Sequence, residues 1–192
     1  MIGELNEVNP KGGDYPITLY KKLMLTDQND KESIKKYIMS RKYLIVLNNK
    51  QSINDYIDLW NQYLEVYMND PDGYNELSEV YLMVNEYDKA IFCLEELLLH
   101  TPNDYKVLNK IGDIYASKNN PEDAKTAINF YSRSILINPT PRAFFGIQNC
   151  ASIIKRLDEK TRKLVNISKQ ELSKMYADTP FRDFDINGIF KV

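Results

Sequence analysis

The sequence predicts an all-α protein organised as a solenoid of antiparallel helix pairs. Its apolar residues recur three and four positions apart, which places them on one face of a helix. Only 7 glycines and 8 prolines interrupt the 192 residues. A triplet of large residues also returns after about 34 positions, and its two copies are Tyr74, Leu77, Tyr81 and Leu108, Ile111, Tyr115.

The second helix of each pair repeats in the same way, with its two copies at Ala90, Leu94, Pro102 and Ala127, Tyr131, Pro139. The alanine leaves room for the second helix to nest against the first. The proline ends the helix because it has no N–H to donate. Ser78 and Gly112 supply the small residue expected where helices cross closely. The period and intervals match those of tetratricopeptide (TPR) repeats.

Weaker copies of the pattern extend outward from these two repeats. Before them, Tyr56, Trp60 and Tyr63 occupy second-helix positions, and the first helix of that repeat is expected from about Glu32 to Leu47. Tyr20 and Leu23 fit a lone second helix earlier still. After Pro141, a degenerate first helix is expected to contain Phe144, Ile147 and Ala151, and a capping helix to contain Leu164, Ile167, Leu172 and Met175.

We therefore expect a single repeat domain over residues 1–192. Its turns fall at signals such as Asn119-Asn120-Pro121. The expected segments are a partial repeat at 17–28, a degenerate repeat at 32–70, repeats at 71–104 and 105–141, a degenerate repeat and cap at 142–178, and a tail at 179–192.

The amino-acid composition argues against several classes of protein. Hydrophobic residues make up 43% and charged residues 27%, which are globular values. The net charge of −2 gives the chain no electrostatic reason to bind nucleic acid. Two unpaired cysteines, the absence of a long apolar run and the absence of a signal-peptide pattern predict a reduced, cytosolic protein.

The sequence offers no catalytic constellation. His100 is the single histidine and lies at the expected end of a helix. A zinc site of Cys93, Cys150 and His100 lacks any ligand pair at motif spacing. A hydrolase using Glu95 and Glu96 is the alternative from another class, but consecutive residues point about 100° apart on a helix. We expect no enzyme activity, no cofactor and no metal.

Partner binding is expected on the concave face formed by the first helices of the repeats. The residues predicted to line it are Asp72, Asn75, Glu79, Lys106, Asn109 and Asp113. Such a groove suits a neutral or basic segment. The alternative is a co-chaperone that grips an acidic C-terminal peptide, but Glu79 and Asp113 would repel its carboxylate.

The C-terminal tail is a second candidate for binding. It carries Phe181, Phe184 and Phe190, and basic residues outnumber acidic ones from Pro141 onward. Two roles stay open for it, which are assembly at the cytosolic face of a membrane and capping of the last repeat.

Three segments resemble one family. They are Tyr74-Asn-Glu-Leu-Ser-Glu-Val-Tyr81, Ala90-Ile-Phe-Cys-Leu-Glu-Glu-Leu97 with Thr101-Pro-Asn103, and Arg142-Ala-Phe-Phe-Gly-Ile147. They are similar to subunit 2 of the endoplasmic reticulum membrane protein complex, over roughly residues 17–176. The resemblance implies a cytosolic repeat scaffold of a membrane insertase, hetero-oligomeric, with indirect or peripheral membrane contact. Members carry further repeats before this chain's first residue, so it is expected to be N-terminally short.

Overall fold

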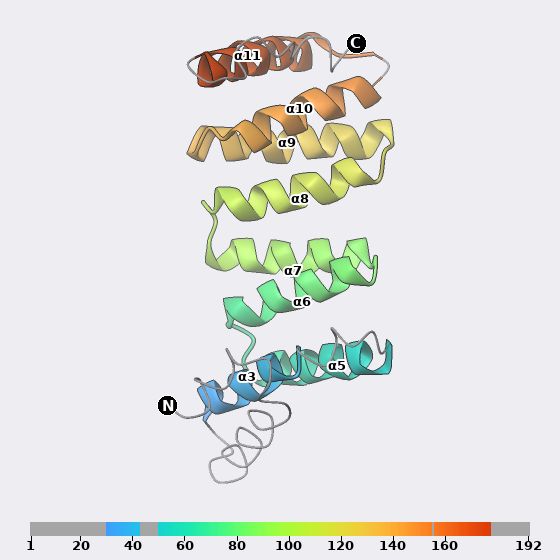
Figure 1. Cartoon of the computed structure of the whole chain (residues 1–192), viewed down its shortest axis with the longest axis vertical. Coiled ribbons are helices and arrows are strands. Elements are labelled where there is room, and N and C mark those ends of the chain that lie inside the picture. The colour runs from blue at the N-terminus through green and yellow to red at the C-terminus, as the bar shows by residue number, and fades with distance from the viewer. Residues whose placement is uncertain (1–29, 43–49, 155, 178–192) are drawn as a thin grey trace. The chain divides into compact units, whose positions relative to one another are not determined.

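The computed structural model describes residues 30–42, 50–154 and 156–177, and these residues form helices without a strand. The all-α prediction is therefore confirmed (Figure 1). The helices are α3 (Lys31–Ser40), α5 (Lys50–Val66), α6 (Pro71–Met83), α7 (Tyr87–His100), α8 (Tyr105–Ser117), α9 (Pro121–Ile137), α10 (Pro141–Ile153) and α11 (Glu159–Tyr176).

The helices belong to two compact units, one up to Asn85 and one from Glu86 onward. The first unit contains α3, α5 and α6, and the second contains α7 to α11. The expected partial repeat at 17–28 and the tail with Phe181, Phe184 and Phe190 lie outside the described residues. The division into repeats stays a prediction.

Local sequence explains where the helices begin. Asp70, Asp104 and Asp158 each cap a helix by accepting a hydrogen bond from a backbone N–H in its first turn. Prolines follow the caps of α6, α9 and α10, where their missing N–H costs nothing. Asn85 and Asn119 adopt positive φ angles of 63° and 54° after α6 and α8. Asparagine tolerates this conformation better than most residues, so both sites favour a sharp turn.

The core of the first unit is aromatic. Tyr56, Trp60 and Tyr63 on α5 are at most 3% exposed, as their predicted second-helix positions require. The ring of Trp60 meets those of Tyr56 and Tyr63 edge to face, with centroids 6.3 and 5.3 Å away. Tyr37 and Ile38 of α3 are also buried. The first helix expected from about Glu32 to Leu47 begins at Lys31, and residues 43–49 lie outside the described residues.

The core of the second unit follows the predicted repeat positions. Leu94, Leu108 and Ile147 are fully buried. Cys93 and Cys150 are buried and free, and burial raises the pKa of each thiol to about 12. Both thiols are therefore protonated at neutral pH, which makes them poor nucleophiles and poor metal ligands.

Helix α11 packs on α10 through a narrower face than the sequence suggests. Val165 and Leu172 are buried, and Gln148 of α10 donates a hydrogen bond from Nε2 to the carbonyl oxygen of Val165 at 2.8 Å. Ile167, expected among the capping residues, is 51% exposed instead. Among the described helices α11 packs against α10, so Ile167 lies away from that contact.

Tryptophan at Ala127 or Ala90 is expected to destabilise the second unit by about 1–3 kcal/mol, because overpacking displaces buried neighbours. Both alanines are 0% exposed. Thermal unfolding followed by circular dichroism measures the effect. Lys89→Trp is the matched control, since Lys89 is exposed and adjacent to Ala90. If both alanine variants melt like the control, the second helices do not nest at these positions.

Candidate partner-binding surface

The predicted site residues of the first unit lie on α6, and two of them are paired with lysines. The Asp72 carboxylate lies 2.5 Å from the Nζ of Lys35, and the Glu79 carboxylate lies 3.2 Å from the Nζ of Lys42. Asn75 is half-buried on the same helix. Asp72 and Glu79 are therefore each paired with a lysine, one on α3 and one shortly after the end of α3.

Asp70 anchors this arrangement, although it was not among the predicted site residues. Its side chain is 2% exposed and accepts a hydrogen bond from the hydroxyl of Tyr63. It also lies 3.2 Å from the Nζ atoms of Lys31 and Lys35 and caps α6 through the backbone N–H of Asp72. One carboxylate thereby joins the three described helices of the unit.

The charge states of this cluster follow from its contacts. Burial by itself raises the pKa of Asp70, but hydrogen bonds from Tyr63 and the two lysines outweigh burial and hold the pKa below its ordinary range. Burial likewise lowers the pKa of Lys35, and the hydrogen bonds to Asp72 and Asp70 more than reverse this effect. The contacts within the cluster therefore favour the ionised form of Asp70 and the charged form of Lys35.

A second buried acid, Glu76, faces the other end of α3. It is 9% exposed, accepts a hydrogen bond from Lys42 at 2.8 Å and another from the Tyr56 hydroxyl at 3.2 Å. The pair Lys42–Glu76 is separated by 34 residues, which is the repeat period. That coincidence is the signal by which the sequence could have revealed the contact.

The predicted site residues of α8 differ in their exposure to solvent. Lys106 is exposed, with its Nζ 6.0 Å from the centroid of the Tyr105 ring. Asn109 is only 3% exposed, and its amide nitrogen lies 3.5 Å from the hydroxyl of Thr140. A buried amide cannot contact a partner, so Asn109 is a packing residue. Asp113 is the residue that reaches a groove.

This groove lies between α8 and α10 and has a volume of about 470 Å³. Residues from both helices and Tyr131 of α9 surround it, namely Asp113, Ala116, Ser117, Tyr131, Arg142, Phe145, Gly146 and Asn149. Asp113 accepts a hydrogen bond from the Tyr131 hydroxyl at 2.6 Å and pairs with Arg142. Its charge is therefore compensated inside the groove.

Two glycines leave the space that the ring of Tyr131 occupies. A Cβ atom added at Gly112 would lie 2.8 Å from the ring, and one at Gly146 would lie 2.4 Å from it. Side-chain atoms do not approach so closely, so the ring occupies space that only glycine leaves free on α8 and α10. Ser78, Gly112 and Gly146 are spaced by one repeat period each. Sequence reasoning singled out the first two and missed the third.

The geometry revises the expected character of the surface. The sequence suggests an acidic face that selects a neutral or basic partner. In the structure Asp72, Glu79 and Asp113 are each paired with a cation. Within the α8–α10 groove, half-buried Phe145 and exposed Asn149 provide apolar contact and hydrogen-bonding capacity. The groove fits a largely uncharged segment better than a basic one.

The described residues contain neither a metal-binding cluster nor a membrane-spanning helix. They contain no group of three or more His, Cys, Asp and Glu side chains placed to hold a metal ion. Across residues 30–42, 50–154 and 156–177, no helix has both the length and the apolar character needed to cross a bilayer.

Comparison with known proteins assigns the repeats to a family. The model of the EMC2 TPR-like repeat domain matches residues 22–116. ER membrane protein complex subunit 2-A of Xenopus laevis is 27% identical over 135 residues, which cover 70% of this chain and 43% of that protein. The chain resembles the EMC2 family over these residues. The predicted resemblance is thereby confirmed.

Two further comparisons agree with the TPR fold. TPR repeat protein oca3 of Schizosaccharomyces pombe is 25% identical over 146 residues, which cover 74% of this chain and 52% of oca3. A crystal structure of MamA superposes with a TM-score of 0.69 at 22% identity, covering 92% of this chain and 98% of MamA. The MamA likeness concerns the fold alone. The chain spans about half the length of the curated relatives it matches.

Proposed function

We propose that this chain is a scaffold subunit of an endoplasmic reticulum membrane protein complex, acting from the cytosolic side without catalysing a reaction. The observation that carries the proposal is the EMC2 repeat domain at residues 22–116, shared with relatives named as subunit 2 of that complex. Through its complex, the chain would support insertion of transmembrane segments into the membrane.

The architecture suits such a role. A scaffold must present defined surfaces to its partners, and packed helix pairs do so. The α8–α10 groove is a defined place for a partner segment, because buried Tyr131 packs between α8 and α10 and donates a hydrogen bond to Asp113. Asp113, the one residue of the predicted concave face that lines this groove, is thus proposed to organise it.

Co-purification tests the proposed role. The tagged chain is recovered from detergent-solubilised membranes of the cells that encode it, and its partners are identified by mass spectrometry. We expect multi-spanning membrane proteins in stoichiometric amounts. Recovery of cytosolic chaperones alone would instead support a TPR co-chaperone. Loss of membrane insertion of a reporter segment in cells lacking the chain, with restoration by the wild-type chain, would support the insertase role.

Arginine at Asn149 is expected to reduce recovery of the partner seated in the α8–α10 groove about tenfold, which corresponds to ~1.4 kcal/mol. Asn149 is exposed in the groove, so the longer charged side chain fills the space without disturbing the core. Quantitative mass spectrometry of the same pull-down measures the change. Asn166→Arg is the matched control, because Asn166 is exposed on α11 outside the groove. Equal recovery with both variants would exclude this groove as the binding site.

A further inference from the structure

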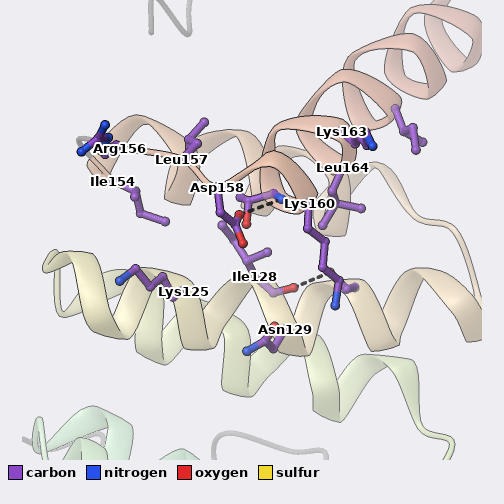
Figure 2. Close-up of a pocket in the computed structure, with 13 residues that line it drawn as sticks. Lys125, Ile128, Asn129, Ile154, Arg156, Leu157, Asp158, Lys160, Lys163 and Leu164 are labelled. Carbon is purple, nitrogen blue, oxygen red and sulfur yellow. Dashed lines mark hydrogen bonds between the residues drawn. The ribbon is translucent and has the colours of Figure 1, made fainter.

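A second groove lies between α9 and α11, and neither the predicted site nor the proposed function accounts for it. Its volume is about 690 Å³, which lies within the range of volumes of known ligand-binding pockets. Figure 2 shows Ile128 of α9 on the side of that helix toward Asp158 and Leu164. The groove lies wholly within the second unit.

The floor of this groove is apolar. Ile128 and Ile154 are buried beneath it, and Leu157 and Leu164 are half-buried along it. Ile167 continues the stripe and is 51% exposed. A concave apolar surface bordered by polar residues is typical of grooves that receive the apolar face of a helix.

The rim is basic. Lys125, Arg156, Lys160 and Lys163 line the groove, and Lys125 and Arg156 lie at one end of it in Figure 2. The acid that lines it, Asp158, accepts the hydrogen bond from the backbone N–H of Thr161 at 2.9 Å and thereby caps α11. The carboxylate of Asp158 therefore serves as the N-cap of α11.

Two rim lysines have partners on their own helices, at 2.8 Å from Lys125 to Glu122 and 2.6 Å from Lys163 to Glu159. Both glutamates are more than 80% exposed. Exposed pairs of this kind contribute little and exchange readily for a better partner. The rim therefore keeps the capacity to attract an acidic ligand.

We infer that the α9–α11 groove is a docking site for an acidic amphipathic helix of a partner protein. The apolar floor would receive residues spaced at i, i+3, i+4 and i+7, while the rim would pair with carboxylates flanking them. An anionic membrane has the same charge, but a flat lipid surface cannot fill a concave pocket, so the shape favours a peptide.

The test uses the full chain and a fluorescently labelled synthetic peptide that has leucine at i, i+3, i+4 and i+7 and glutamate at most other positions. Fluorescence anisotropy measures binding. A peptide with lysine in place of each glutamate controls for the apolar contribution. We expect the glutamate peptide to bind at least about tenfold more tightly than the lysine peptide.

Protein variants locate the site. Arg156→Glu together with Lys160→Glu is expected to weaken the glutamate peptide by about tenfold or more. Lys174→Glu, on the exposed surface of α11 outside the groove, is expected to leave binding unchanged. Ile167→Asn should weaken binding without changing helicity, because Ile167 is half exposed. Circular dichroism verifies that each variant is folded.

Three results of the peptide experiment would overturn the inference: equal binding of both peptides, equal effects of the groove variants and Lys174→Glu, or failure of the glutamate peptide to bind. Sedimentation with vesicles containing phosphatidylserine is the remaining arm. The groove is instead a membrane site if three conditions hold together. The wild type must bind these vesicles, Arg156→Glu with Lys160→Glu must abolish that binding, and the glutamate peptide must fail to compete with the vesicles. None of these outcomes bears on co-purification through the α8–α10 groove, so the proposed function is tested separately.

Discussion

Alanine at Tyr131 is expected to destabilise the second unit by about 3–5 kcal/mol, as truncations of comparable buried aromatic residues do. The ring is 2% exposed and lies against the backbones of α8 and α10 at Gly112 and Gly146. Its removal leaves a cavity between three helices and releases the hydrogen bond to Asp113. Thermal and urea unfolding followed by circular dichroism measure the loss.

The same ring makes a second substitution informative. Gly146→Ala improves helix propensity by about 1 kcal/mol, yet it should destabilise the protein, because the new methyl group meets the ring of Tyr131. In the Tyr131→Ala background the clash is absent, so Gly146→Ala should become neutral or stabilising. A double-mutant cycle measures this coupling. Additive effects of the two substitutions would contradict the contact between ring and glycine.

Alanine at Asp70 is expected to destabilise the first unit by about 2–4 kcal/mol. The loss of the helix cap contributes about 1 kcal/mol, and the buried Tyr63 hydroxyl left without its acceptor contributes about 1–3 kcal/mol. Trp60 is the single tryptophan and is buried in this unit, so its fluorescence reports the unfolding of α5 directly. An unchanged unfolding midpoint would show that the cluster contributes nothing.

The contribution of Asp70 should also depend on pH. Because its pKa is lowered in the folded protein, the ionised form stabilises the fold fully above the unfolded pKa of about 3.9. That stabilisation is lost as the pH falls through the lower, folded pKa. Asp70→Asn retains the cap and the acceptor for Tyr63 but cannot titrate. Its Trp60 unfolding midpoint should therefore decline less steeply below about pH 4 than that of the wild type.

Local sequence was sufficient to predict the helical repeats. The 34-residue return of large and small residues predicts which faces pack together, and Trp60, Ala90, Ala127 and Tyr131 are buried as that pattern requires. Turn and cap residues such as Asn119 and Asp70 mark the helix boundaries. These features depend on contacts within a helix or between neighbours in the chain, which periodicity encodes directly.

The candidate surface needed the tertiary structure. Asn109 was predicted to line the groove, but α8 packs against α7, α9 and α10, so more than one of its faces is buried. Asp113 was predicted to be a repelling acid, whereas Arg142, 29 residues away, compensates its charge. Long side chains choose partners by distance in space, and helical periodicity does not contain that distance.

The sequence alone therefore established the all-α repeat architecture, its 34-residue period and the family resemblance, because these follow from residue spacing. The folded structure decided which charges pair, why Gly146 must be small and where the two grooves of the second unit lie. The α9–α11 groove shows the difference most clearly. Its apolar floor and basic rim come from segments about 30 residues apart, and only packing on α10 brings them together.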